Sequence, residues 1–168
     1  MANTNTNLHG SYAYHDTLKG VYYGPGCVHT ALPRLLSVLG GSKAFIVTGK
    51  SLREKVRICI HSTPSADVHF IHKTNVIRNI EEILKNNGAF AATFSDIGQH
   101  APVQGITRGI EAFTAAGADI IVSIGGGSPI DASKAIVYRL HQQNGGKFLN
   151  HIAIPTTLSA AEYRVSLS

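Results

Sequence analysis

Residues 120–135 read IIVSIGGGSPIDASKA, and this stretch decides the fold more than any other part of the chain. The apolar residues 120–124 have the composition of a central parallel strand that is covered on both faces. Three glycines follow, and glycine lets the backbone turn sharply and approach a ligand closely. Ser128 then suits an N-cap, Pro129 the first helical position and Asp131 a capping box, so a helix is expected to begin at Ser128.

This strand, glycine turn and helix start together suit the binding of a pyrophosphate. The free N–H groups of the first helical turn and the positive end of the helix dipole would face Gly125, Gly126 and Gly127, and both attract anions. Glycine-rich turns between a strand and a helix also occur where nothing binds, which is the alternative interpretation of this segment. Three glycines followed by a complete cap favour the binding site.

Strand and helix signals alternate along the rest of the chain, which predicts an α/β fold: a parallel sheet flanked by helices on both faces. Ligands of such sheets bind beyond the carboxyl ends of the strands. Residues 1–11 are expected to be a mobile polar leader, and residues 12–23 a short hairpin. Strands are expected at 43–48, 89–95, 119–124 and 151–154, and helices at 32–39 with Pro33 in its first turn, from 74 to a stop at 86–88, from 103 to Gly117, and at 128–140.

Composition and charge exclude several classes of function. The chain has 168 residues, 43% of them hydrophobic, which is enough for one globular domain with a buried core. The net charge is +5, but Lys and Arg are scattered singly, so no nucleic-acid partner is expected. No long apolar run and no apolar leader region are present, so no membrane association is expected and a cytoplasmic location is favoured. Neither Cys27 and Cys59 nor the nine histidines show metal-type spacing, so no metal site is expected.

The same residues resemble the signature of the iron-containing (group III) alcohol dehydrogenase family, which includes the maleylacetate reductases. The resemblance is carried by the glycine turn and Ser128, followed by Asp131 and Lys134, and it extends over most of residues 20–163. Other matching segments are GPG at 24–26, AFIVT at 44–48, GQHAPV at 98–103 and IPTTLSAAE at 154–162. The last of these looks more like the maleylacetate reductase branch.

The resemblance implies a Rossmann-like N-terminal domain that binds a dinucleotide, NADP or NAD. Gly125, Gly126, Gly127 and Ser128 would bind the pyrophosphate, and Thr156, Thr157 and Leu158 would lie against the nicotinamide-ribose side of the cofactor. Asp131 and Lys134 are one helical turn apart and can form a pair. A structural role is expected for Asp131, whereas structural support and cofactor contact stay equally open for Lys134.

The end of the first buried strand bears on the choice between the two cofactors. Many relatives carry an acidic residue there, which holds the ribose 2′-OH of NAD. This sequence has Gly49, Lys50 and Ser51 instead, so no carboxylate is expected to repel a 2′-phosphate, while Lys50 and Ser51 offer a charge and a donor. NADP is therefore slightly preferred over NAD.

Residues 56–73 interrupt the resemblance, because residues 50–55 would run directly into residues 74–78. One interpretation is an inserted hairpin that turns at residues 63–65. The other is a translated intron. Together with the departure from the family pattern after Tyr163, it makes an imperfectly spliced or early-terminated product as plausible as a genuine small protein.

The resemblance also implies a second, helical domain that holds the metal and covers the substrate. Residues 1–168 are therefore expected to be a partial dinucleotide-binding domain of a truncated oxidoreductase, without hydride transfer on its own. Two other functions stay open. One is a non-redox enzyme, such as an isomerase or cyclase, that uses the open cleft; the other is a non-catalytic interaction protein. A homo-oligomer is expected, and the sequence does not indicate the substrate.

Overall fold

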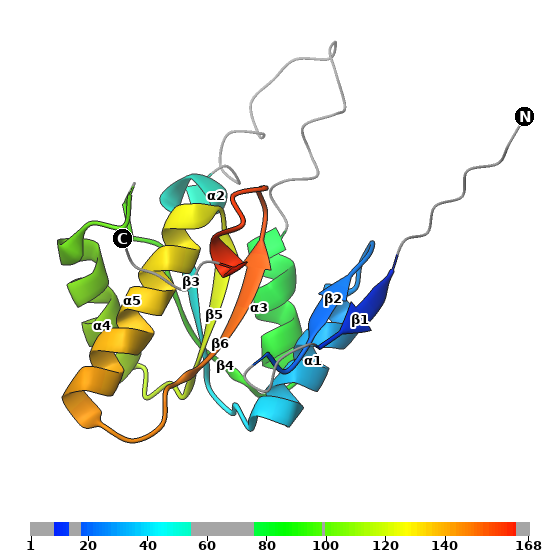
Figure 1. Cartoon of the computed structure of the whole chain (residues 1–168), viewed down its shortest axis with the longest axis horizontal. Coiled ribbons are helices and arrows are strands. Elements are labelled where there is room, and N and C mark those ends of the chain that lie inside the picture. The colour runs from blue at the N-terminus through cyan, green and yellow to red at the C-terminus, as the bar shows by residue number, and fades with distance from the viewer. Residues whose placement is uncertain (1–8, 14–17, 55–75, 99, 164–168) are drawn as a thin grey trace, which may run out of the picture. The chain divides into compact units, whose positions relative to one another are not determined.

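A computed structural model describes the chain except at residues 1–8, 14–17, 55–75, 99 and 164–168 (Figure 1). The interruption expected at 56–73 and most of the predicted leader therefore lie outside the described residues. The chain divides into two compact units, Met1–Gly41 and Ser42–Ser168, and each is described by itself.

The first unit holds a two-stranded ribbon and one helix. Strand β1 (Gly10–Tyr12) pairs antiparallel with β2 (Val21–Tyr23), as the predicted hairpin requires. β1 includes two residues that were assigned to the leader, because its pairing starts at Gly10. Helix α1 (Val28–Leu39) begins well before the leucine pattern that predicted it, so Pro33 lies in the second turn and the expectation of a first-turn proline is wrong.

The second unit is built on a parallel four-stranded sheet with the strand order β4-β3-β5-β6. Each strand agrees with its predicted range to within one residue at either end. β3 and β5 are buried along their whole length, as their largely apolar sequences predict for central parallel strands. The strands are β3 (Ala44–Thr48), β4 (Phe90–Phe94), β5 (Ile120–Gly125) and β6 (Asn150–Pro155).

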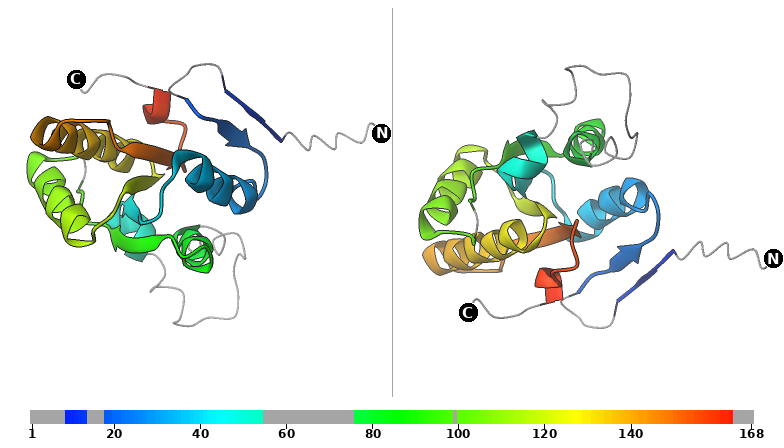
Figure 2. Two further views of the ribbon diagram at one scale, coloured as in Figure 1. Left: turned by 90° about the horizontal axis from the view of Figure 1, so that it is seen from below. Right: turned by 90° about the horizontal axis from the view of Figure 1, so that it is seen from above.

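Helices cover both faces of this sheet. α4 (Val103–Ala115) and α5 (Gly127–Asn144) lie on one face, and α3 (Val76–Asn86) lies on the other (Figure 2). The predicted α/β fold, a parallel sheet flanked by helices, is therefore confirmed. The core under α4 and α5 is formed by aromatic and aliphatic side chains that include Phe45, Val47, Ile106, Phe113, Ile121 and Ile136.

Two shorter helices lie in the same unit and were not predicted. α2 (Lys50–Glu54) starts directly after Gly49, and the 3-10 helix η3 (Ala161–Tyr163) follows the loop after β6. Both are too short to show a helical repeat in the sequence.

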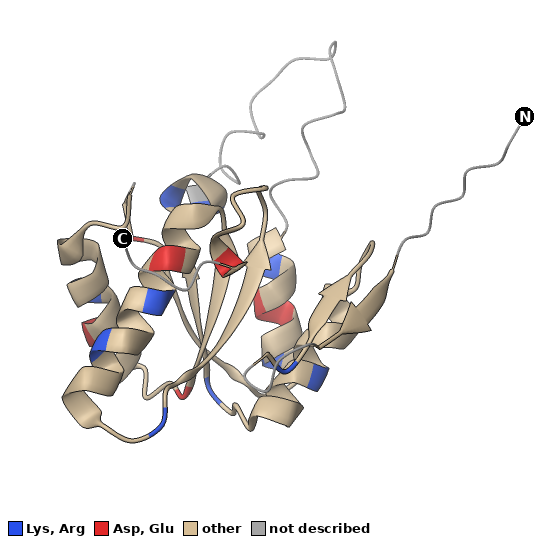
Figure 3. Ribbon diagram, viewed as in Figure 1, with Lys and Arg blue, Asp and Glu red and all other residues tan. Residues whose placement is uncertain are grey.

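Basic and acidic positions are interspersed along α3 and α5, so neither helix presents a face of one charge (Figure 3).

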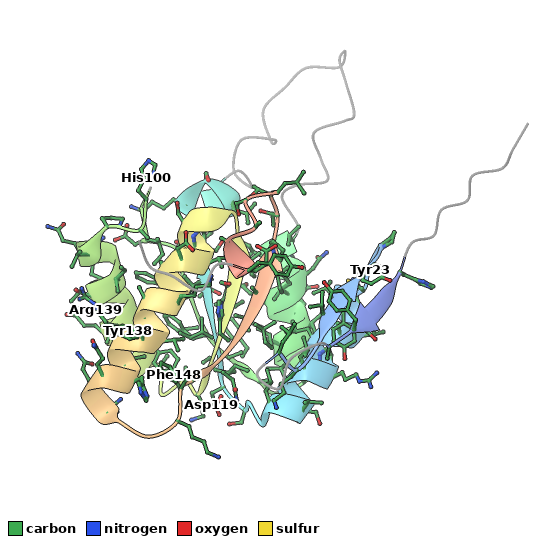
Figure 4. All side chains as sticks on the ribbon, in the orientation of Figure 1. Tyr23, His100, Asp119, Tyr138, Arg139 and Phe148 are labelled. Carbon is green, nitrogen blue, oxygen red and sulfur yellow. The ribbon has the colours of Figure 1, made fainter. Side chains whose placement is uncertain are left out.

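Asp119 ties together the amino ends of β3 and β5. Its carboxylate accepts hydrogen bonds from the backbone N–H groups of Ser42 and Lys43 and from the Ser42 hydroxyl, at 2.5 to 3.0 Å. Partial burial opposes ionisation, but the bonds from Ser42 and Lys43 outweigh it and hold the pKa of Asp119 below its ordinary value. Figure 4 shows Asp119 at one end of the sheet and His100 at the other, carboxyl end.

Gly105 lets α4 pack directly against the loop that follows β4. A Cβ at this position would lie 2.4 Å from the carbonyl oxygen of Ile97, which is a backbone atom. Alanine is the better helix former by about 1 kcal/mol, but overpacking a tight site costs about 1–3 kcal/mol. We therefore expect Gly105→Ala to lower the free energy of unfolding, which urea denaturation measures. The exposed neighbour Gln104, changed to alanine, is the control; equal or higher stability in Gly105→Ala would contradict the packing argument.

Candidate functional site

The strand order places a candidate binding site at the carboxyl edge of the sheet, between β3 and β5. From β3 the chain proceeds to β4 on one side, and from β5 it proceeds to β6 on the other side. The loops after β3 and β5 therefore leave in opposite directions, and ligands of doubly wound sheets bind in the crevice that forms there. The two loops lie close together, since a Cβ at Gly49 would be 3.9 Å from Cγ of Pro129.

The glycine turn after β5 leaves little space for a side chain at its first two positions. Gly125 has φ 144°, and a Cβ there would lie 2.9 Å from Cγ of Pro129. A Cβ at Gly126 would lie 3.1 Å from Oγ1 of Thr157, whereas Gly127 has its nearest neighbour at 3.7 Å. The backbone is therefore accessible to a ligand at the start of α5, and Thr157 lies beside Gly126. Contact of Thr157 with a cofactor stays a prediction.

The start of α5 differs from the predicted cap. The residue at the N-cap is Gly126, with φ −84° and ψ −155°, and no side chain caps the helix there. The prediction of Ser128 as N-cap, with Pro129 first and Asp131 in a capping box, is therefore wrong by two residues. Because glycine has no side-chain oxygen to satisfy the first N–H groups, those groups are left for water or an anion.

Ser128 instead contacts the loop that follows β4. Its Oγ accepts a hydrogen bond from the backbone N–H of His100 at 3.3 Å. His100 and Ala101 have φ values of 59° and 47°, a left-handed conformation that costs energy for residues other than glycine. Two consecutive strained residues therefore lie directly beside the glycine turn, at the end of the sheet where Figure 4 shows His100.

Ion pairs join the carboxyl ends of β3 and β4. Nζ of Lys50 lies 2.6 Å from Oδ1 of Asp96, and Nε of Arg108 lies 2.9 Å from Oδ2 of the same carboxylate. The hydrogen bond from Lys50, with the charge of Arg108, holds the pKa of Asp96 below its ordinary value against a smaller effect of desolvation. Residues 49–51 themselves carry no carboxylate, but the neighbouring loop places Asp96 beside Lys50, which the sequence did not indicate. Ser51 lies exposed in α2.

The loop after β6 forms the other side of the site. The backbone N–H of Thr156 donates to the carbonyl of Gly125 at 2.9 Å, which holds this loop against the glycine turn. Leu158 is fully exposed. An open hollow of about 460 Å³ is lined by residues 155–158 together with Ala160, Glu162 and Tyr163. Its position next to the turn suits the part of a ligand that extends beyond a bound pyrophosphate.

Asp131 borders the glycine turn, and Lys134 connects α5 to the loop after β6. Oδ2 of Asp131 lies 3.8 Å from the position of a Cβ at Gly127, so this carboxylate borders the glycine turn. Nζ of Lys134 donates a hydrogen bond to the carbonyl oxygen of Ala161 in η3. Lys134 therefore supports the loop after β6. The pair between Asp131 and Lys134 that their spacing allows stays a prediction.

A polar pair under α5 was not found from the sequence. Oγ of Ser123 in β5 lies 2.7 Å from Nε2 of His151 in β6. Burial, with a smaller effect of the Lys134 charge, lowers the pKa of His151 to about 4, so the imidazole is neutral at pH 7. The signal in the sequence was a serine and a histidine in two otherwise apolar strands.

No group of three or more His, Cys, Asp or Glu side chains comes together to hold a metal ion within the described part of the chain. In that same part, no helix has both the length and the apolar character that a membrane crossing needs.

Comparison with known proteins gives a consistent match. The sequence model of the iron-containing alcohol dehydrogenase family matches residues 19–164. A maleylacetate reductase of Rhizobium sp. (strain MTP-10005) is 43% identical over 72 residues, which are 43% of this chain and 18% of the reductase. The 1-propanol dehydrogenase PduQ of Citrobacter freundii is 31% identical over 88 residues, or 52% of this chain and 23% of that enzyme.

The fold gives the same result. The crystal structure of maleylacetate reductase from Agrobacterium tumefaciens matches with a TM-score of 0.57 and 26% identity, over 80% of this chain and 30% of that one. The chain thus spans less than a third of the length of each of these three relatives.

Proposed function

Because this chain belongs to the iron-containing alcohol dehydrogenase family, we propose that it is the dinucleotide-binding part of an NAD(P)-dependent oxidoreductase. The observation that carries the proposal is the glycine turn at the start of α5. A side chain at Gly125 or Gly126 would crowd Pro129 or Thr157, and the helix begins without a side-chain cap. A cradle of backbone N–H groups at the positive end of a helix dipole is suited to a pyrophosphate.

We assign a role in cofactor binding to each residue at or near this turn according to its position. Gly125, Gly126, Gly127 and Ser128 bind the pyrophosphate. The Ser128 hydroxyl already accepts a bond from the His100 N–H, so its own proton is directed to a phosphate oxygen.

Thr156, Thr157 and Leu158 line the hollow that would receive the nicotinamide ribose. Lys134 supports the loop after β6, and Asp131 borders the glycine turn. On the other side of the turn, Gly49, Lys50 and Ser51 lie where the adenosine half would pass, with NADP preferred over NAD.

The family implies a nicotinamide cofactor and an iron ion, and the described residues suit the first but not the second. The nicotinamide accepts or donates a hydride when bound, and the residues named above bind and orient the cofactor. For iron, the described residues bring no set of donors together, so we assign no residue to a metal and derive no step through one.

Isothermal titration with NADPH and NADH, combined with hydrogen exchange, tests the proposal. We expect saturable binding and slower exchange of the backbone N–H groups at 125–128 and 156–157, because these groups would be covered by phosphate and ribose. The N–H groups of Ser42 and Lys43, bonded to Asp119 at the opposite end of the sheet, are the internal control. Absence of binding at millimolar cofactor, or protection that spares residues 125–128, would refute it.

A further inference from the structure

Three charged side chains from three different elements meet at the ends of β3 and β4. Lys50 is the first residue of α2, Asp96 follows β4, and Arg108 lies in α4. Each oxygen of the Asp96 carboxylate holds one of the two cations, at 2.6 and 2.9 Å. Arg108 also donates from Nη2 to the carbonyl oxygen of Asp96 at 3.3 Å, which fixes its guanidinium at this place. The cluster carries one more positive than negative charge.

The carboxylate of Asp96 occupies the position that a bound anion would take between these cations. A phosphate could bind the same two cations through two of its oxygens, as the carboxylate does. It has a third oxygen and more negative charge than the carboxylate. The exposed fractions of the side chains are 59% for Lys50, 41% for Asp96 and 48% for Arg108. A ligand therefore reaches the cluster without unfolding the loops around it.

The cluster also lies where the adenosine half of a dinucleotide is expected. With the pyrophosphate at the start of α5, the adenosine passes over the end of β3 toward β4. Gly49, at the end of β3, forms a backbone bridge with Asp96. The group that hangs from the adenosine ribose at this point is the 2′-hydroxyl in NAD and the 2′-phosphate in NADP.

We propose that Lys50, Asp96 and Arg108 form a 2′-phosphate site in which Asp96 holds the two cations in place until the phosphate of NADP(H) displaces it. This inference rests on the proposed function and extends it, because it names the residues that distinguish the two cofactors. The negative charge of Asp96 opposes the binding of both NAD(H) and NADP(H). The two cations strengthen the binding of NADP(H) alone, because only this cofactor carries the additional phosphate.

The fragments 2′,5′-ADP and 5′-AMP test this directly, since they carry the adenosine half with and without the 2′-phosphate. We expect the full chain to bind 2′,5′-ADP more tightly than 5′-AMP by titration calorimetry. Arg108→Gln and Lys50→Gln should each weaken 2′,5′-ADP by about tenfold, the value of one charged hydrogen bond, and change 5′-AMP by less than about twofold. Asp96→Asn should strengthen 2′,5′-ADP, because the competing carboxylate is gone.

Lys43→Gln is the matched control, because it removes the same charge from an exposed position at the opposite end of β3. Equal affinity for the two fragments, or an equal loss in Lys43→Gln, would overturn the inference. Tighter binding of inorganic phosphate than of 2′,5′-ADP would also overturn it and make the cluster a general anion site. If NADH binds and Gly126→Val abolishes its binding while these tests fail, only this inference fails. If neither dinucleotide binds, the proposed function fails as well.

Discussion

Gly126→Val is expected to weaken the binding of both NADH and NADPH by about 100-fold, which corresponds to the loss of one or two charge-assisted hydrogen bonds to the pyrophosphate. The Cβ of a residue at 126 lies 3.1 Å from Oγ1 and 3.3 Å from Cγ2 of Thr157, so this neighbour must move. The two additional methyl groups of valine then extend over the start of α5 and cover the N–H groups that the phosphate needs. Titration calorimetry with both cofactors measures the effect.

Loss of binding must be separated from loss of stability. Gly88→Ala provides the control, because Gly88 has φ 66° and a Cβ there meets nothing within 4 Å. This variant therefore costs backbone energy, about 1 kcal/mol, at the amino end of β4 and far from the glycine turn. Thermal unfolding of both variants by circular dichroism shows whether each is folded at the titration temperature. Wild-type affinity in Gly126→Val, or an equal loss in Gly88→Ala, would contradict the assigned site.

The sheet was predictable because a strand that is buried on both faces has a mostly apolar sequence. The segments 44–48 and 120–124 are apolar except for Thr48 and Ser123, which only a covered strand or a buried helix tolerates, and for 120–124 the glycine turn that follows favours the strand. The sequence predicts the start of α1 too late, because the prediction rests on the leucines alone, whereas Val28 and Ala31 extend the same apolar face by one turn. α2 was missed for the related reason that five residues are too few to show one.

The candidate site was predictable in its location and only partly in its contacts. The sequence placed Ser128 at the N-cap because a serine before a proline is the usual local signal. In the structure its hydroxyl is engaged by the His100 N–H, a tertiary contact from 28 residues away that no local pattern records. Asp96 was missed beside Lys50 for the same reason: the two loops meet only because β3 and β4 are neighbours in the sheet.

His151 is expected to make the stability of the chain depend on pH between about 4 and 6.5. Its pKa is about 4 in the folded chain, chiefly through burial, and 6.5 is its ordinary value. Between these values the unfolded chain binds a proton that the folded chain does not, so acidification favours unfolding. This contribution is therefore constant above pH 6.5 and is lost as the pH falls toward 4, by roughly 3 kcal/mol in total.

Urea denaturation across pH 4 to 7.5, on the wild type and on His151→Gln, measures this contribution as a difference. Glutamine does not titrate, and its amide still reaches a hydrogen bond with the Ser123 hydroxyl, so the variant removes the proton and keeps the polar partner. We expect the free energy of unfolding of His151→Gln to fall much less steeply below pH 6.5. His29→Gln, which changes an exposed histidine of α1, should keep the wild-type slope. Parallel curves for wild type and His151→Gln would mean that the imidazole gains a proton in the folded chain as easily as in the unfolded one, and that it is not held neutral between β6 and α5.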